Sequence, residues 1–137
     1  MNKTITLCLM DPPYESANTT TALRIVDAAI RQHVNVNVFA YEGAVALTVK
    51  DQAPHANPVH GTSVEEEKHP TTKDFVASLA RLADAMNVNF DWVNCGLCVD
   101  ERGTGNVIES ARRGGPPDFL EMVSTSDASL VVPTRRD

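Results

Sequence analysis

Hydrophobic positions recur along this chain with two different periods, and the change from one period to the other predicts alternating strands and helices. Residues 3–10 form a short apolar run that stops at two prolines, which is typical of a buried strand followed by a sharp loop. In residues 17–33, by contrast, Leu23, Val26 and Ile30 recur at the spacing of one helical face. The start of the chain therefore predicts a strand, a loop and an amphipathic helix.

The same two patterns continue to the end of the chain. They predict strands at residues 34–41, 88–94 and 128–134, and helices at residues 71–87, 104–114 and 116–126. Thr71 and Asp74 form a capping-box pattern at the start of the helix at 71–87. Residues 42–49 fit one helical turn. Residues 50–70 have no periodicity and hold three prolines and three histidines, which predicts a long loop.

Strands that alternate with helices are typical of a parallel sheet with both faces covered. We therefore predict an α/β fold, a three-layer sandwich around a mainly parallel sheet, with residues 1–137 as one domain. Ligands of such sheets bind beyond the carboxyl ends of the strands. Two loops take that position here: the sequence DPPYES after the first strand, and the sequence CGLC after the strand at 88–94.

Composition and charge narrow the classes of function. The net charge of −6 and the pI of about 5.1 argue against a nucleic-acid-binding protein, and the longest basic cluster is only Arg112-Arg113. No segment approaches the length of a membrane span, and the apolar run at the N-terminus is too short for a signal peptide. We expect a cytoplasmic protein whose three cysteines stay reduced.

Cys95 and Cys98 form a Cys-x-x-Cys pair directly after the strand at 88–94. One interpretation is a zinc site, but such a site takes four ligands, or three and a water molecule. The other available ligands are Cys8 and the loop histidines His55, His60 and His69, which lack tight ligand spacing. We therefore expect neither a bound metal nor a cofactor.

Three further interpretations of the pair stay open. A thioredoxin-like dithiol has this spacing, but its cysteines open a long helix, whereas here the next helix is expected to begin near Thr104. A nucleophilic thiol that carries sulfur as a persulfide needs a partly exposed strand end and nearby positive charge. Arg102 is the best local source of that charge, with Arg112 and Arg113 as others. Two thiols packed as small hydrophobic groups are the third interpretation.

Three stretches in order along the chain carry a resemblance to one family. The first is DPPYESANTTTALRIVDAAI followed by VNVFAYEGAVAL, the second is CGLCVDERG, and the third is ESARRGGPPDFLEMVSTSDASLVV. They resemble the N-terminal half, the Cys-x-x-Cys-x-Asp-x-Arg-Gly segment and the C-terminal end of the DsrE-like family, of the DsrE/TusD sulfur-relay type. The resemblance covers nearly the whole chain.

The resemblance implies a Rossmann-related fold with about five strands and assembly into homo-oligomers, often trimers or hexamers. It also implies that Cys95 receives sulfur from a donor protein as a persulfide and passes it to an acceptor protein. Cys98 matches a second cysteine that only some members have. Two alternatives remain: a non-catalytic oligomeric module that binds a small ligand or a partner at the same crevice, or a dithiol reductase that uses both cysteines.

Four residues are expected to surround the thiols. Tyr14 and Glu15 lie in the loop after the first strand, while Gly96 and Arg102 follow Cys95. The family's Pro-Tyr-Gly-x-Glu loop has glycine at the position of Glu15 and an acid at the position of Ala17, so the pocket differs here. Asp100 is expected to fix the local turn through backbone N–H groups.

Overall fold

The computed structural model of the protein describes residues 1–67 and 70–134. Its centre is a five-stranded sheet in the order β4-β3-β2-β1-β5, and every neighbouring pair of strands is parallel. The strands are β1 (Thr4–Leu9), β2 (Asn35–Ala40), β3 (Phe90–Cys95), β4 (Ala111–Gly114) and β5 (Ala128–Val132). The prediction of an α/β fold around a parallel sheet is confirmed.

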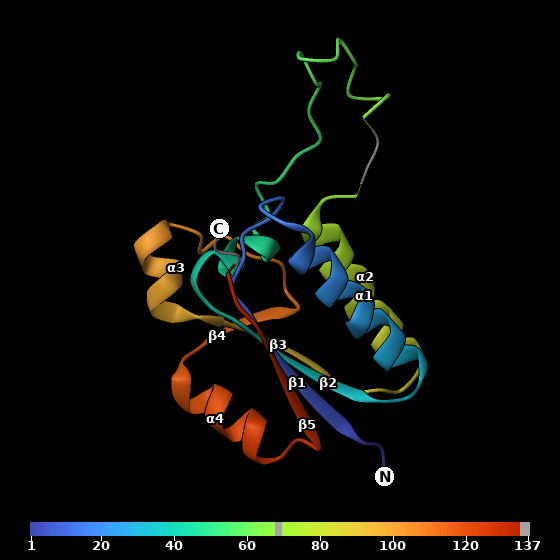
Figure 1. Cartoon of the computed structure of the whole chain (residues 1–137), viewed down its shortest axis with the longest axis vertical. Helices are drawn as coiled ribbons and strands as arrows, with labels where there is room; N and C mark the ends of the chain where they lie inside the picture. Colours follow the sequence, from blue (N-terminus) through green and yellow to red (C-terminus); the bar gives the residue numbers. More distant parts are fainter. Residues whose placement is uncertain (68–69, 135–137) are drawn as a thin grey trace.

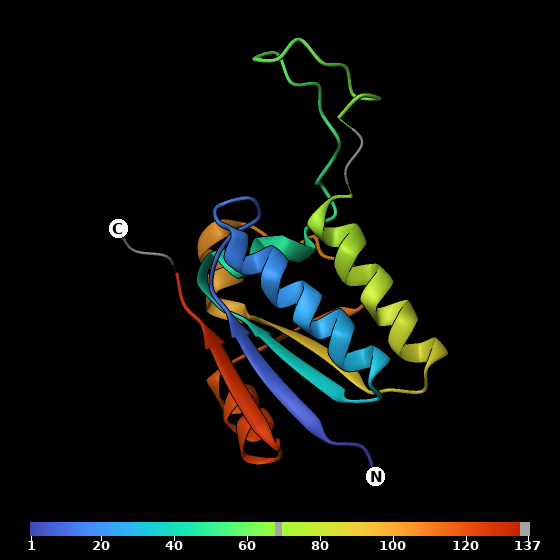
Figure 2. The same cartoon turned by 45° about the vertical axis from the view of Figure 1, so that its right-hand side comes forward.

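Helices cover both faces of the sheet, which gives three layers (Figures 1 and 2). The helices α1 (Ala17–Arg31) and α2 (Thr72–Ala85) lie side by side on one face, and α4 (Pro116–Ser124) lies on the other. The 3-10 helix η1 (Glu42–Thr48) and the short helix α3 (Gly96–Arg102) lie at the carboxyl ends of the strands. That edge of the sheet therefore carries the candidate site.

The ends of the helices follow from local side-chain chemistry. Ser16 caps α1, since its hydroxyl accepts a hydrogen bond from the backbone N–H of Asn18. Thr71 precedes α2 as predicted, but its hydroxyl donates to the Asp74 carboxylate at 2.8 Å and makes no cap bond to the backbone. The capping-box pattern therefore marks the correct start of α2 with a different hydrogen bond.

A buried polar chain connects the core to the carboxyl edge of the sheet. Trp92 is fully buried, and its indole N–H donates to the side-chain oxygen of Asn94 at 3.0 Å. The Asn94 amide donates in turn to the hydroxyl of Thr48 in η1, also at 3.0 Å. Because buried polar groups need partners, these bonds fix η1 against β3 next to the cysteines.

The helix predicted at residues 104–114 is wrong. The structure instead has an irregular segment followed by β4, because the backbone of this segment bonds to η1 and the residues after it. Lys50 N–H donates to the carbonyl of Asn106 at 2.8 Å, and Ile108 N–H donates to the carbonyl of Thr48 at 3.0 Å. These tertiary hydrogen bonds replace the intrahelical ones, and the chain then continues as β4, which pairs with β3.

The loop predicted at residues 50–70 is confirmed where the structure describes it. Residues 53–67, which we call the arm, project away from the body of the protein (Figures 1 and 2). Within the arm, Asn57 and Thr62 exchange two backbone hydrogen bonds. At its base, the Gln52 side chain donates to the Ala46 carbonyl and accepts from Lys73 N–H, so both ends of the arm are held together.

The outer strand β5 is the least covered part of the sheet. The side chains of Leu130 and Val131 remain 45% and 51% exposed. The outer edge of β5 pairs with no strand in the described part of the chain. No helix among the described residues is long and apolar enough to span a lipid bilayer.

Candidate functional site

Cys95 is the last residue of β3, and α3 begins at the next residue, Gly96. The prediction that the next helix begins near Thr104 is therefore wrong. The helix forms because Cys98 and Val99 bury one side of it, and it ends at Gly103, which has a left-handed φ of 63° and donates its N–H to the Val99 carbonyl. The sequence argued against a thioredoxin-like dithiol because no helix was expected directly after Cys95. That helix exists, although it has only seven residues.

Both thiols are buried in the isolated chain. Cys95 is 3% exposed and Cys98 is 6% exposed, so the expectation of a partly exposed thiol is wrong. The two thiols are nevertheless neighbours, since the interaction with Cys95 is one of the causes that raise the pKa of Cys98. All three cysteines of the chain are free, and no disulfide closes the pair.

The surroundings of Cys98 hold it as a neutral thiol. Burial, followed by the hydrogen bond with Cys95, raises the pKa of Cys98 above its ordinary value. Two groups act in the opposite direction: the backbone N–H of Glu42, which donates to the Cys98 sulfur at 3.2 Å, and the charge of Arg102. Glu42 reaches this position with a left-handed φ of 52°, which is uncommon for a residue with a side chain.

A positive charge near Cys95 comes from β4. The side chain of Arg113 crosses directly over Gly96: a Cβ atom on Gly96 would lie 2.6 Å from the Arg113 Nε and 2.9 Å from its Nη2. The guanidinium is held there by Asp100 of α3, with N–O distances of 2.8 and 2.6 Å. Asp100 therefore binds an arginine side chain, and its expected role in a turn is wrong.

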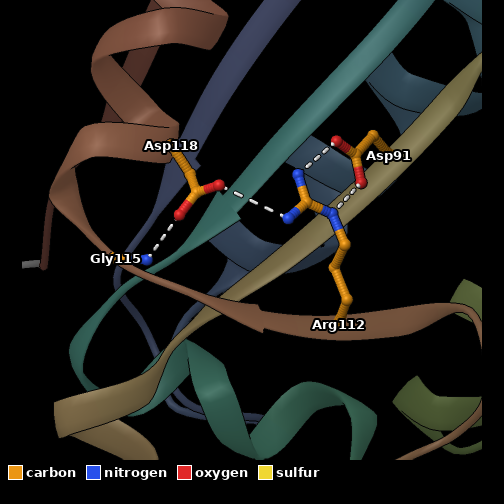
Figure 3. A network of polar contacts seen from close by, with 4 residues as sticks. All are labelled: Asp91, Arg112, Gly115 and Asp118. Atoms are coloured by element: carbon orange, nitrogen blue, oxygen red, sulfur yellow. Dashed lines mark hydrogen bonds and ion pairs between the residues drawn. The ribbon is translucent and has the colours of Figure 1, made fainter.

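The neighbouring arginine serves the opposite face of the sheet, because successive side chains of a strand point to opposite sides. Arg112 makes two hydrogen bonds of 2.9 Å to Asp91 and one of 3.4 Å to Asp118, as Figure 3 shows. The other Asp118 oxygen accepts the N–H of Gly115 at the start of α4, and this bond is the main reason why the pKa of Asp118 is lowered. Arg112 thus fastens β4 and α4 and lies apart from the thiols.

The remaining sequence-predicted residues take different positions. Tyr14 is exposed and lines a cavity of about 380 Å³ with residues of α1 and α2, among them Leu23 and Phe75; neither Cys95 nor Cys98 lines it. Glu15 is an exposed residue of the same loop. Arg102 ends α3 and donates to the Cys98 carbonyl and to Glu101, both at 3.4 Å. Its charge therefore acts on Cys98.

The other cysteine and the histidines lie elsewhere. Cys8 is buried in β1, where burial and the Glu42 charge raise its pKa to about 11. His55 and His60 are exposed on the arm, and His69 lies outside the described residues. Among the residues that the structure describes, no three His, Cys, Asp or Glu side chains gather as metal ligands would.

Comparison with known proteins decides the family. The sequence profile of the DsrE/DsrF-like family matches residues 3–132, which is nearly the whole chain. The chain belongs to the DsrE/DsrF-like family. The crystal structure of the YchN protein from E. coli has the same fold, with a TM-score of 0.68 and 18% sequence identity over 96% of this chain and 99% of that one. A search of curated proteins gave no match.

In this member of the DsrE/DsrF-like family, the sequence located the two cysteines but gave an incomplete picture of their neighbours. Glu42 reaches Cys98 from a different segment, and no local pattern announces that contact. For α3, a signal was present: an arginine followed by glycine, Arg102-Gly103, is typical of a helix C-terminus. Arg113 was one of three arginines considered, and only the strand position of β4 shows that it crosses Gly96.

Proposed function

We propose that this DsrE/DsrF-like protein carries sulfur as a persulfide on Cys95. The observation that carries the proposal is the place of Cys95: the carboxyl end of a central parallel strand, in contact with a second thiol, with the side chain of Arg113 crossing the adjacent Gly96. Ligands of parallel sheets bind at this edge, and positive charge favours the thiolate, which is the nucleophile. Membership of a sulfur-relay-type family supports the same chemistry.

Loading and release are two thiol exchange steps with opposite directions. In loading, the Cys95 thiolate attacks the outer sulfur of a donor persulfide, a new S–S bond forms on Cys95, and the donor leaves as a thiolate. In release, an acceptor thiolate attacks the outer sulfur on Cys95, and Cys95 leaves as the thiolate. Neither step needs a metal, a cofactor or an external oxidant. Donor and acceptor are proposed to be partner proteins.

The burial of Cys95 sets a condition on this function. A thiol that is 3% exposed in the isolated chain must be uncovered before a donor can reach it. Next to the thiol, the three atoms nearest to the position of the missing Gly96 Cβ all belong to the Arg113 guanidinium. Movement of one exposed arginine side chain is a much smaller change than opening the core.

The direct test is intact mass measured without reductant after incubation with inorganic polysulfide. Protein that carries one extra sulfur atom gains about 32 Da. Protein alkylated beforehand with iodoacetamide should gain none, which separates thiol loading from adsorbed sulfur. Absence of any gain in the unmodified protein would leave the non-catalytic binding module as the better account.

A dithiol reductase is the second candidate function, because the cysteine pair does open a helix. The two candidates differ in what they leave behind: a reductase ends its cycle with a Cys95–Cys98 disulfide and a mass loss of about 2 Da, as two thiol hydrogens are removed. The test therefore uses a small disulfide substrate with no persulfide present: formation of the Cys95–Cys98 disulfide under these conditions would favour the reductase, because the carrier is expected to form it only after it has been loaded with sulfur.

We also propose that the protein is a cytoplasmic homo-oligomer, such as a trimer or hexamer. Its three cysteines are all free, which suits a reducing compartment. Leu130 and Val131 expose apolar side chains on opposite faces of β5, and the outer edge between them is unpaired among the described residues, so a second copy that packs along this edge can cover them.

Leu130→Lys is expected to weaken that assembly, because it places a charge on a surface that becomes buried between subunits. Light scattering at micromolar concentration should give a multiple of 14.9 kDa for the wild type and a shift toward 14.9 kDa for the variant. Val59→Lys is the matched control, since Val59 is an exposed valine on the arm. Equal masses for all three proteins would place the interface elsewhere or exclude assembly.

A further inference from the structure

We propose that Arg113 is the positioning residue that stabilises negative charge on the Cys95 sulfur. Asp100 is the partner of Arg113 while Cys95 is a neutral thiol. The inference deepens the proposed function and rests on it: the charge is that of the thiolate before loading and of the persulfide afterwards. Arg113 would then act on the reacting sulfur through its charge, whereas Arg102, the arginine favoured by the sequence, acts on Cys98.

The position of Arg113 is the first argument. Residue 113 pairs with Asn94 across the β3–β4 ladder, one residue before Cys95. Its guanidinium lies so close to Gly96 that three of its atoms would be within 2.9 Å of a Cβ atom there. A glycine directly after the nucleophile is therefore what allows the arginine to cross the site. Any larger residue at position 96 would push the guanidinium away.

The charge balance is the second argument. The pKa of Arg113 is raised mainly by its hydrogen bonds to Asp100 and by the Asp100 charge, and a negative Cys95 raises it further. Cys95 therefore lies within electrostatic reach of this guanidinium. Asp100 and Arg113 are both exposed, so water competes for their ion pair, and the guanidinium can exchange one anionic partner for another at small cost.

The neighbouring elements carry other charged or titratable groups. They are Cys98, Asp100, Glu101 and Arg102 on α3 and Glu42 on η1, with Asp118 of α4 on the opposite face of β4 beside Arg112. Arg102 is engaged by the Cys98 carbonyl and Glu101, and Asp118 by Gly115 and Arg112. Arg113 is therefore the arginine best placed to stabilise a negative charge that develops on the Cys95 sulfur.

The experiment measures the alkylation rate of Cys95 by iodoacetamide as a function of pH, in a Cys98→Ser background. Residues 82–102 are then one tryptic peptide with a single thiol, which separates Cys95 from Cys8. Arg113→Gln should raise the midpoint of the pH profile by about half to one unit, and should slow alkylation at pH 7 by about three- to tenfold. The midpoint reports charge, whereas the plateau at high pH reports access.

Arg112→Gln is the matched control, since it removes the same charge from the adjacent residue on the other face of β4. Its midpoint should stay at the wild-type value. Arg113→Lys should restore most of the shift because it keeps the charge, and Gly96→Ala should reproduce the Arg113→Gln midpoint because its Cβ displaces the guanidinium. These two variants also keep the test decisive should Arg113→Gln fold poorly.

Asp100→Asn tests the partner. In the protein that keeps Arg113, Asp100→Asn should lower the midpoint of the pH profile, because the guanidinium loses its competing partner. In the Arg113→Gln protein most of this effect should disappear, since Asp100 acts through the arginine. Equal midpoints in the Arg113→Gln, Arg112→Gln and unsubstituted proteins would overturn the inference. No sulfur donor is present, so this failure is distinct from failure of the proposed function, which is read from persulfide mass.

Discussion

Cys95→Ser is expected to abolish sulfur loading, and Cys98→Ser is expected to leave it intact. A serine hydroxyl cannot accept sulfur as a persulfide, so the variant at the reacting position loses the whole mass gain of about 32 Da. Cys98 is not expected to take part in loading, because it is held as a neutral thiol that accepts a hydrogen bond from the Glu42 N–H. The measurement is intact mass without reductant after inorganic polysulfide, at equal protein concentration.

Cys8→Ser is the control for buried thiols that have no place at the sheet edge. Cys8 lies within β1, and its pKa is raised to about 11, so it is a poor nucleophile near neutral pH. Loading should match the wild type provided that the variant folds, which circular dichroism establishes. Full loading of the Cys95→Ser protein would show that another sulfur carries the cargo and would end the present mechanism.

The second large effect concerns the lifetime of the loaded state. Cys98 can attack the inner sulfur of a Cys95 persulfide, which forms a Cys95–Cys98 disulfide and releases HS⁻. Only the Cys98 thiolate does this, and the pKa of the Cys98 thiol is raised by burial and by the hydrogen bond with Cys95. Below that pKa the thiolate fraction, and with it the rate at which HS⁻ is released, should rise about tenfold per pH unit. The persulfide is therefore expected to last longest at neutral pH and to discharge as the solution becomes alkaline.

Sulfide released from loaded protein between pH 7 and pH 10 measures this directly, and intact mass confirms the disulfide. Cys98→Ser should hold its sulfur across the range, apart from slow decay common to both proteins. Equal rates in the two proteins at every pH would show that Cys98 takes no part in release. A rate that falls as pH rises would contradict the sign of the argument.

The sequence was sufficient for the parts of the fold in which one period is sustained over several residues. The helices α1, α2 and α4 and the strands β1, β2, β3 and β5 were all predicted close to their positions. The strand β4 was not, because it has four residues at a sheet edge and carries arginines on both of its faces. Ion pairs with Asp91 and Asp100 hold it, and a pattern of apolar residues cannot reveal them.

In the candidate site, too, the features set by the order of the elements could be predicted, and the features set by packing between segments could not. Cys95 and Cys98 could be placed at the carboxyl edge because the order of elements in the chain determines where a parallel strand ends. Their burial, the Glu42 contact and the crossing of Gly96 by Arg113 depend on how separate segments pack. Tyr14 follows β1 at the same edge, and its place in a cavity with α1 and α2 likewise depends on packing between segments.

The arm has a consequence for how this protein can vary over evolutionary time. Gln52, before the arm, accepts the N–H of Lys73, after it, and the Lys73 ammonium donates to the Lys50 carbonyl, so the two ends of the arm are held together at its base. The hydrogen bonds of Asn57 and Thr62 lie within the arm itself. Closing a flexible loop costs only about 0.6 kcal/mol more for each doubling of its length. Residues can thus be gained or lost between Gln52 and Thr71 while the sheet register and the thiol edge stay unchanged, which leaves this segment free to diversify.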